Sequence, residues 1–343
     1  MKMKRAMLAF GIAALVLIPI FSVAMAEEAP PASQFDVIAE TADDYLNDPD
    51  TMLNISSKDL LSQMLSGDPY IISCRGAEDF ATGHIPGAIN MSGSALFQTE
   101  YLTRLPGDEH IYTYCYTGHS GSQLAALLNL CGYDTTNLTW GIMGWTKDTE
   151  VATKQFSNPT TDLPTETTAN EADGNFGFPN VYNTSSTDIA EIVRTACDSY
   201  ASGGFKNIKA TDLYDLITDD DTANDPVILS IRKAEDYAKG HIPGAINIGL
   251  NDIAKKENLQ KLDPDRQVVV YCYTGRTGSQ ATAILNALGY DAVNLLWGIS
   301  GWTTNADVAP KRFNPETSVD YPFATGAGAE IPAAPSGGGG CGG

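Results

Sequence analysis

Several short motifs that mark a bound metal or cofactor are missing from this sequence. Its six cysteines include no CxxC pair, so zinc sites and thioredoxin-type redox sites lack their usual spacing. A CxxCH haem site and a dinucleotide-binding fingerprint are lacking as well. We therefore expect no metal ion and no cofactor.

Positive charge is also scarce. The 343 residues contain 21 Lys and Arg against 42 Asp and Glu. Residues 1–26 hold three of the basic residues and no acidic one, which leaves 18 against 42 and a net charge of −24 for the remainder. This charge argues against nucleic acid and anionic membranes as partners. An anionic substrate would need a local positive site.

The N-terminus has the features of a targeting segment. A basic start, MKMKR, precedes an apolar run and the small residues of Ala24-Met25-Ala26. This order is typical of a signal peptide at residues 1–26. We expect export to a periplasmic or extracellular location. An uncleaved membrane anchor is the alternative, because the apolar run is about long enough to span a bilayer.

Most of the chain is an internal duplication. The stretches YCYTGHSGSQ (114–123) and YCYTGRTGSQ (271–280) lie 157 residues apart, and the same offset relates AEDFATGHIPGAIN to AEDYAKGHIPGAIN. Self-similarity over a domain-sized period indicates two copies of one fold. We predict a first domain at 40–150, a linker at 151–185, a second domain at 186–307 and a flexible, Gly- and Pro-rich tail at 308–343.

Each copy alternates short apolar strands with helices. YIIS and IYTYC in the first copy correspond to VILS and QVVVYC in the second, and an amphipathic helix follows each glycine-rich loop. This alternation favours an α/β fold with two tandem modules, each a parallel sheet flanked by helices. Ligand sites in such sheets lie beyond the carboxyl ends of the strands, which is where Cys115 and Cys272 fall.

Cys115 and Cys272 are the candidate nucleophiles. Each stands at a strand end before a short loop that leads into a helix. Free backbone N–H groups and the positive helix end stabilise a thiolate there and make a pocket for an anion. Such a thiolate can attack an electrophilic sulfur or phosphorus atom. A buried structural cysteine is the alternative for one isolated motif, but two matched copies weaken it.

The motif GHIPGAIN after Arg-x-x-Glu, the cysteine-led loop and the closing G-x-x-G-W together resemble the rhodanese superfamily. The resemblance covers both copies. It implies a tandem-domain sulfurtransferase that works through a cysteine persulfide. The loops CYTGHS and CYTGRT resemble the C-x-x-x-x-[ST] form of sulfurtransferases. Phosphatase-like relatives carry C-x5-R, and Gly121 and Gly278 occupy the position of that arginine here.

The resemblance also implies a two-step reaction. A loop cysteine would attack the outer sulfur of a donor such as thiosulfate, a small sulfur-containing anion, and a thiol or cyanide would then accept the sulfur. A protein that supplies the acceptor thiol, or a redox protein, is an expected partner. The substrate-binding groups would be the remainder of the two loops: Tyr116, Thr117, Gly118, His119 and Ser120, and Tyr273, Thr274, Gly275, Arg276 and Thr277.

One charged position distinguishes the loops. Arg276 is permanently charged and can hold an oxyanion with two parallel hydrogen bonds. His119 is expected to be neutral at pH 7 and to gain charge in mildly acidic solution. We therefore predict that the second site handles anionic donors better at neutral pH. The alternative is that both side chains point into solvent.

Two further cysteines are candidate acceptor or resolving thiols. In the resembled fold Cys74 ends a strand that neighbours the strand of Cys115, and the second copy has Ile231 at this position. Cys74 can therefore resolve a persulfide as a disulfide, with a buried inert thiol as the alternative. Cys341 lies in the Gly-rich tail and can reach a loop as acceptor, or form an intermolecular disulfide.

Other recurring residues have structural interpretations. Arg75 with Glu78, and Arg232 with Glu235, are expected to form ion pairs that hold the GHIPGA turn. The histidine of that turn, His84 or His241, is expected to bond to the backbone.

Two other functions stay open at this point. The same thiolate pocket would serve redox work on polysulfide, selenite or tellurite. A non-catalytic module could bind sulfane sulfur or oxyanions for an electron-transfer partner.

Overall fold

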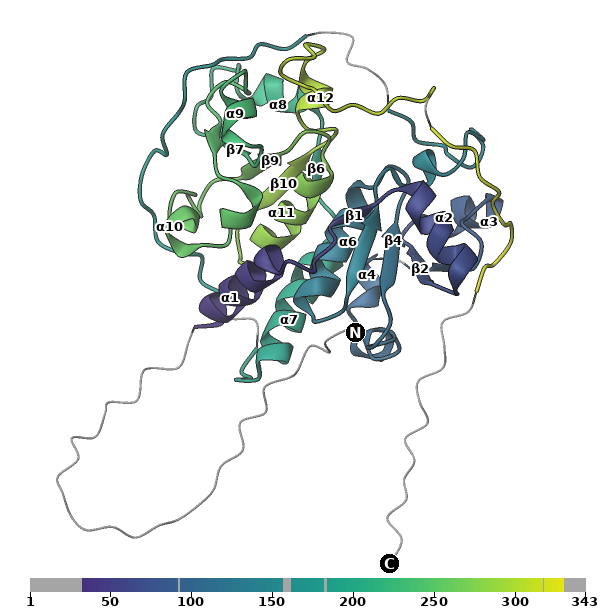
Figure 1. The fold of residues 1–343 in the computed structure, drawn as a ribbon. Helices are drawn as coiled ribbons and strands as arrows, with labels where there is room; N and C mark the ends of the chain where they lie inside the picture. The colour runs from purple at the N-terminus through teal and green to yellow at the C-terminus, as the bar shows by residue number, and fades with distance from the viewer. Residues whose placement is uncertain (1–32, 92, 157–161, 182–183, 317, 330–343) are drawn as a thin grey trace, which may run out of the picture. The chain divides into compact units, whose positions relative to one another are not determined.

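The structure is a computed structural model, and it describes residues 33–329 apart from 92, 157–161, 182–183 and 317 (Figure 1). The predicted signal peptide and Cys341 lie outside the described residues. The described residues all belong to one compact unit. Among them, no helix combines the length and the apolar character needed to cross a bilayer.

The first copy, here called module 1 (residues 34–156), contains a sheet of five parallel strands in the order β1-β5-β4-β2-β3. Its elements in chain order are α1 (Gln34–Asn47), β1 (Asn54–Ile55), α2 (Ser57–Ser66), β2 (Tyr70–Ser73), α3 (Ala77–Thr82), β3 (Ile89–Asn90), α4 (Gly93–Leu96), α5 (Thr99–Leu102), β4 (Ile111–Tyr114), α6 (His119–Leu130), β5 (Thr135–Leu138) and the 3-10 helix η1 (Gly141–Gly144).

The second copy, module 2 (residues 189–313), repeats this sheet in the order β6-β10-β9-β7-β8, again all parallel. Its elements are α7 (Ile189–Ser202), β6 (Asn207–Ile208), α8 (Ala210–Leu216), β7 (Val227–Ser230), α9 (Ala234–Tyr237), β8 (Ile246–Asn247), η2 (Leu250–Asp252), α10 (Lys256–Leu259), β9 (Val268–Tyr271), α11 (Arg276–Ala287), β10 (Ala292–Leu295) and α12 (Ile299–Trp302). The predicted α/β class is confirmed.

The central strands explain why helices flank both sheets. Every residue of β4 (IYTY) and β9 (VVVY) is buried. A parallel strand buried on both faces needs cover on both faces. Polar residues set the helix starts: Ser33 accepts the Asp36 amide at the start of α1, and Asp188 accepts the Glu191 amide at the start of α7.

The two modules share the largest hydrophobic cluster, and each module also has a cluster of its own. A single cluster of buried side chains includes Leu124 and Leu127 of α6 together with Ala281 and Leu285 of α11. The leading helices join the same cluster through residues such as Ile38 of α1. The cysteine-led loops stand at the N-termini of α6 and α11, so this packing also brings the two loops together.

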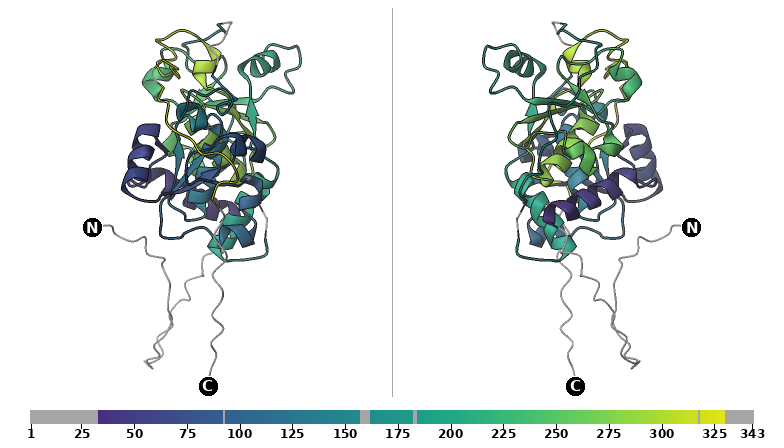
Figure 2. Two further views of the ribbon diagram at one scale, coloured as in Figure 1. Left: turned by 90° about the vertical axis from the view of Figure 1, so that its right-hand side faces the viewer. Right: turned by 90° about the vertical axis from the view of Figure 1, so that its left-hand side faces the viewer.

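An extended segment after each module lies on the other module (Figures 1 and 2). The first strap, residues 162–170, follows module 1 but binds module 2. There the Trp302 indole donates to Pro164 O at 2.7 Å, and Glu166 and His241 exchange two backbone hydrogen bonds of 2.9 Å. The composition of this segment predicts a linker or surface connection, and its contacts with module 2 were not anticipated.

The second strap, residues 320–329, follows module 2 and makes the matching contacts on module 1. The Trp145 indole donates to Pro322 O at 2.8 Å, and His84 and Ala324 exchange two backbone hydrogen bonds of 2.8 Å. The composition predicts a flexible tail from residue 308 onward. The structure differs for the described part of this stretch, up to residue 329, because these bonds and the buried Val308 and Phe313 hold it in place.

Candidate active site

The two candidate nucleophiles occupy equivalent places. Cys115 follows β4 and Cys272 follows β9, at the carboxyl ends of the central strands. The Gly118 amide donates to Cys115 Sγ at 3.1 Å, and the Gly275 amide donates to Cys272 Sγ at 3.1 Å. The two cysteines are buried, with 3% and 2% of their surface exposed. All the cysteines that the structure describes are free thiols.

Glycines shape the loop around each sulfur. Gly118 and Gly275 have φ values of 89° and 85°, in the left-handed region that glycine adopts without strain, and each caps the helix that follows. The closing G-x-x-G-W motif supports the loop from behind, because the Ile142 amide donates to Cys115 O at 2.9 Å. A side chain on Gly141 would overlap that carbonyl.

The structure also shows how closely each loop packs at the position of the C-x5-R arginine. A Cβ on Gly121 would lie 2.5 Å from Asn137 Oδ1, and a Cβ on Gly278 would lie 2.7 Å from Asn294 Oδ1. Real Cβ atoms do not approach other atoms this closely, so a side chain at either position would force the neighbouring asparagine to shift. Glycine at these positions therefore suits the shorter form of the loop.

Cys74 lies beside Cys115. Strands β2 and β4 pair in register, with Ser73 opposite Tyr114, so the next residues of the two strands are neighbours. The Cys74 amide donates to Tyr114 O at 2.9 Å, and Cys74 Sγ lies 3.4 Å from the same oxygen. Burial opposes ionisation of Cys115, but hydrogen bonds from the Cys74 thiol and from the amides of Gly121, Thr117 and Gly118 lower its pKa to about 6. The hydrogen bond to Cys115 in turn holds the pKa of Cys74 well above its ordinary value, with burial adding to the effect.

The tyrosine after each cysteine is fixed to the wall of the site. Tyr116 OH donates to Asp79 Oδ2 and Tyr273 OH donates to Asp236 Oδ2. An exposed lysine stands over each ring: Lys154 Nζ is 3.9 Å from the centroid of Tyr116, and Lys311 Nζ is 4.4 Å from that of Tyr273.

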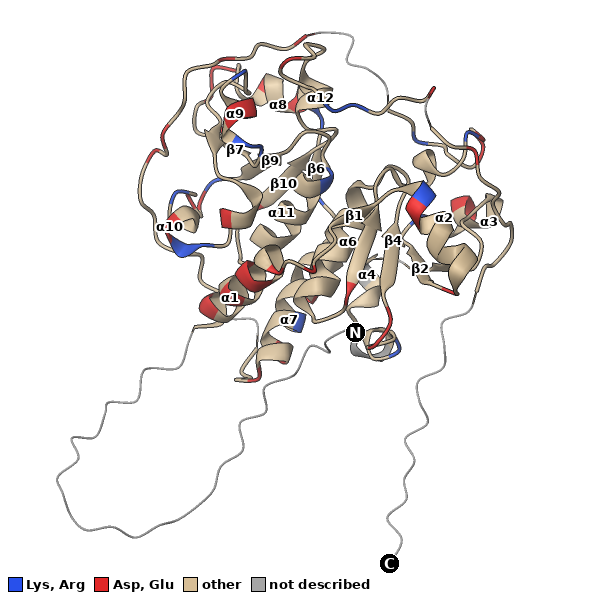
Figure 3. Ribbon diagram, in the orientation of Figure 1, with Lys and Arg blue, Asp and Glu red and all other residues tan. Residues whose placement is uncertain are grey.

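The sequence reasoning missed these two lysines. They lie 157 residues apart, in KQFSNP and KRFNPE, so the repeat offset extended beyond the closing tryptophans would have found them. They supply the local positive charge that an anionic substrate needs. Acidic residues are distributed over both modules, as Figure 3 shows.

His119 and Arg276 each reach across to the other module. The imidazole of His119 is 2% exposed and reaches into module 2, with Nε2 3.2 Å from Thr274 O and its ring edge-on to Trp297. Burial, with a contribution from the charge of Arg276, lowers the pKa of His119 to about 3. The prediction that His119 gains charge in mildly acidic solution is therefore wrong.

Arg276 reaches in the opposite direction. Its guanidinium stacks on Trp140 of module 1 with Cζ 3.7 Å from the ring centroid. Burial lowers the pKa of Arg276 to about 10, and the neighbouring Cys272 opposes this effect, so the side chain stays charged at neutral pH. Its Nη1 is buried without a hydrogen-bond partner among the described residues.

The other predicted polar loop residues lie beside His119 or in the first turns of the two helices. Thr117 Oγ1 lies 2.8 Å from His119 Nδ1, which orients the imidazole. Thr274 is buried and offers its carbonyl to His119. Ser120 and Thr277 are half-buried in the first turns of α6 and α11.

Of the two predictions about the GHIPGA turn, one is confirmed and one is wrong. His84 and His241 bond the backbone as predicted, each through Nδ1 at 2.9 Å from Phe80 O or Tyr237 O. The predicted ion pairs with Glu78 and Glu235 are wrong. The buried Arg75 instead donates to the carbonyls of Gly83, Asp79 and Val151, because a loop that encloses a guanidinium can satisfy it with backbone oxygens.

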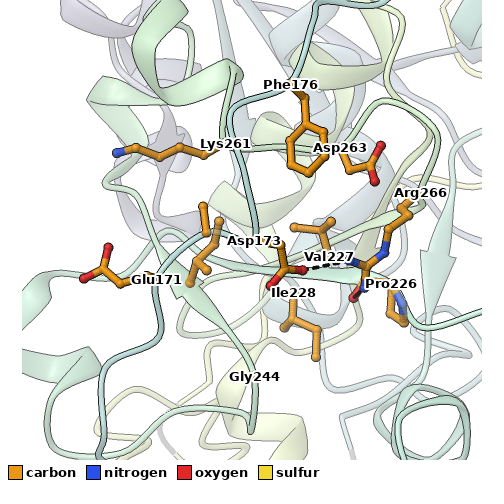
Figure 4. Close-up of a pocket in the computed structure, with 12 residues that line it drawn as sticks. Glu171, Asp173, Phe176, Pro226, Val227, Ile228, Gly244, Lys261, Asp263 and Arg266 are labelled. Carbon is orange, nitrogen blue, oxygen red and sulfur yellow. Dashed lines mark hydrogen bonds and ion pairs between the residues drawn. The ribbon is translucent and has the colours of Figure 1, made fainter. Parts of the chain in front are cut away.

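A separate pocket lies where the chain after the first strap crosses module 2, and it is shown in Figure 4. It is lined by residues such as Phe176, Lys261 and the ion-paired Asp173 and Arg266, whose Nη1 and Oδ2 are 2.9 Å apart. The pocket adjoins Val227 at the amino end of β7, whereas Cys272 follows the carboxyl end of β9. Its lining contains no cysteine, so we do not assign the chemistry to it.

The comparison with known families is decisive at this point. The Rhodanese-like domain matches residues 57–148 and again 209–305, which together make up more than half of the chain. The chain belongs to the rhodanese-like family. The matched ranges contain both cysteine-led loops, and both loops have the shorter, sulfurtransferase-like form.

Each curated relative described here aligns with a stretch of this chain no longer than one module. YrkF of Bacillus subtilis, whose name marks it as a candidate sulfur carrier protein, is 32% identical over 77 residues, which is 22% of this chain and 40% of YrkF. Thiosulfate sulfurtransferase PspE of Escherichia coli is 38% identical over 73 residues, which is 21% of this chain and 68% of PspE. Among solved structures, a rhodanese-like domain protein from Staphylococcus aureus is 26% identical and covers 29% of this chain and 93% of its own, with a TM-score of 0.27.

Proposed function

We propose that this protein is a sulfurtransferase with two active cysteines, Cys115 and Cys272, which take sulfane sulfur from an anionic donor such as thiosulfate. The observation that carries the proposal is the same in both modules. A thiol sits at the carboxyl end of the central strand and accepts the amide of the glycine three residues later at 3.1 Å. Family membership and the names of relatives such as PspE support sulfur transfer in general.

The reaction has two displacements. The thiolate attacks the outer sulfur of thiosulfate, the S–S bond of the donor breaks, and sulfite leaves with the bonding electron pair. The enzyme then holds a persulfide, Cys–S–S⁻, whose charge the loop amides stabilise. An acceptor thiolate or cyanide attacks the terminal sulfur and regenerates the cysteine thiolate.

The lysines over the tyrosine rings fit an anionic donor. Lys154 and Lys311 are exposed cations at the two loops of a strongly acidic protein. We propose that they attract the donor and that the loop amides then receive it. Export to the periplasm or outside the cell, and an acceptor that is a thiol on a partner protein, complete the proposal.

A cyanide–thiosulfate assay tests it. We expect thiocyanate formation from the unaltered protein and none in the double variant Cys115→Ser, Cys272→Ser. Cys341→Ser is the matched control, because it removes a thiol outside both loops. Thiocyanate formation that survives in the double variant would overturn the proposal, and donor binding without turnover would favour a binding module.

A further inference from the structure

The two modules differ in one chemically decisive residue next to the nucleophile. Module 1 has Cys74 beside Cys115, and module 2 has the buried Ile231 at the equivalent place beside Cys272. Module 1 is thus a dithiol site and module 2 a single-thiol site. The loops themselves have nearly the same sequence and the same Gly N–H to Sγ distance, so the difference lies in the neighbouring strand.

We propose that module 1 releases the sulfur it accepts as sulfide, by forming a Cys74–Cys115 disulfide, whereas module 2 retains its persulfide for transfer to an acceptor. This inference rests on the proposed function, because it begins from a persulfide on Cys115. It adds a second activity, persulfide reduction, which the sequence of the loop alone does not specify.

The backbone places the two cysteines within bonding range. Parallel strands lie about 4.8 Å apart, and Cys74 and Cys115 directly follow the paired residues Ser73 and Tyr114. Bridged cysteines have Cα atoms about 4.4–6.8 Å apart. Residues that are opposite each other in a parallel pair present their side chains to the same face of the sheet. Cys74 Sγ lies 3.4 Å from the carbonyl oxygen of Tyr114, the residue that precedes Cys115.

The step balances without an added oxidant. The sulfur of Cys74 attacks Sγ of the Cys115 persulfide, the bond between Sγ and the terminal sulfur breaks, and the terminal sulfur leaves as HS⁻ with the proton of Cys74. The persulfide is reduced to sulfide while the two cysteines are oxidised to a disulfide. An external dithiol must then reduce the disulfide before a second turnover.

The order of events follows from the hydrogen bond between the thiols. While Cys115 is a thiolate, that bond helps to keep the proton on Cys74 and the pKa of Cys74 high, so Cys115 is the sulfur that meets the donor. Persulfidation moves the negative charge one atom outward and leaves Cys115 Sγ neutral. This change removes the charge that held the proton on Cys74.

Variants that isolate each module provide the test, all in a Cys341→Ser background so that the tail thiol does not take part. Each protein receives about one equivalent of thiosulfate, and sulfite, free sulfide and protein mass are measured. In Cys272→Ser, which leaves module 1 active, we expect sulfite and an equal amount of sulfide. The Cys74 and Cys115 peptides should be linked, and dithiothreitol should separate them.

Three matched variants control for the neighbouring thiol. Cys272→Ser with Cys74→Ser keeps a hydroxyl donor but cannot form the disulfide, so we expect sulfite, no sulfide and a retained mass gain of one sulfur atom. Cys115→Ser, which leaves module 2 active, should retain its persulfide. Adding Ile231→Cys to that variant should create sulfide release in module 2.

The outcomes separate the two proposals. If no variant releases sulfite, the proposed function fails. If Cys272→Ser releases sulfite but keeps its persulfide and yields no sulfide, the dithiol inference fails and the sulfurtransferase proposal stands.

Discussion

The ionisation of Cys115 gives the most direct test of how the loop works. At a pKa of about 6, about 90% of Cys115 is thiolate at pH 7, against about 3% for a cysteine of ordinary pKa near 8.5. The gain in reactive species is about 30-fold. A thiolate of lower pKa is also a weaker nucleophile. With a Brønsted coefficient of about 0.45, the rate constant of the thiolate falls about 13-fold, which offsets much of that gain. The pH midpoint of the reaction is therefore more informative than its rate at one pH.

The assay is alkylation of Cys115 by iodoacetamide in Cys272→Ser across pH 4.5–10, followed by peptide mass spectrometry so that other thiols are counted separately. We expect a midpoint near pH 6. Cys74→Ile, which copies module 2, removes a hydrogen bond that offsets burial and should move the midpoint upward. Cys74→Ser keeps a donor and should move it less. A midpoint near 8.5 in the parent protein, or no movement in Cys74→Ile, would refute this account of the loop.

Three other predictions concern charge and burial. In a Cys115→Ser background, Lys311→Gln should raise KM for thiosulfate about five-fold at low salt and leave kcat nearly unchanged. This change corresponds to the loss of about 1 kcal/mol of attraction from a surface charge. An increase in KM that does not shrink at high salt would contradict this prediction. Arg75→Met leaves three carbonyl acceptors of a buried arginine unpaired and should lower the free energy of unfolding by at least about 3 kcal/mol in urea titrations, so an unchanged midpoint would count against the assigned bonds. The pKa of His119 is lower in the folded state than in the unfolded state, so the unfolded state binds more protons between about pH 3 and 6.5. The free energy of unfolding should therefore fall as the pH falls through this range, by about 1.4 kcal/mol per pH unit. His119→Asn should reduce this slope, and equal slopes in the two proteins would disprove the burial effect.

The sequence was sufficient wherever the two copies could be aligned and each residue interpreted within its own copy. The 157-residue offset, the alternation of strands and helices, and the position of Cys115 and Cys272 at strand ends were enough to predict two parallel-sheet modules. The shorter loop form was also readable, and the structure adds what a side chain at Gly121 or Gly278 would displace. These features depend on local chain geometry, which a single sequence specifies well.

The errors about His119 and Arg276 arose where one copy contacts the other. His119 was assigned a mildly acidic titration because an exposed imidazole behaves that way, but the packing of α6 on α11 buries it against Thr274. Arg276 was assigned to its own loop, and its guanidinium also stacks on Trp140 of the other module. No pattern within one copy reports contacts between copies, and so the expected contrast between the two sites needed the three-dimensional arrangement.

The exchanged straps have a consequence for how this chain can be divided. Each half is completed by the trailing chain of the other half, so a fragment cut out at the sequence boundaries would lack the residues that bond Trp145 or Trp302. Two fragments made together should instead reassemble as an interlocked pair. The same geometry would arise from two identical single-copy chains that swap their ends, and joining them in tandem would turn such a swapped dimer into one polypeptide.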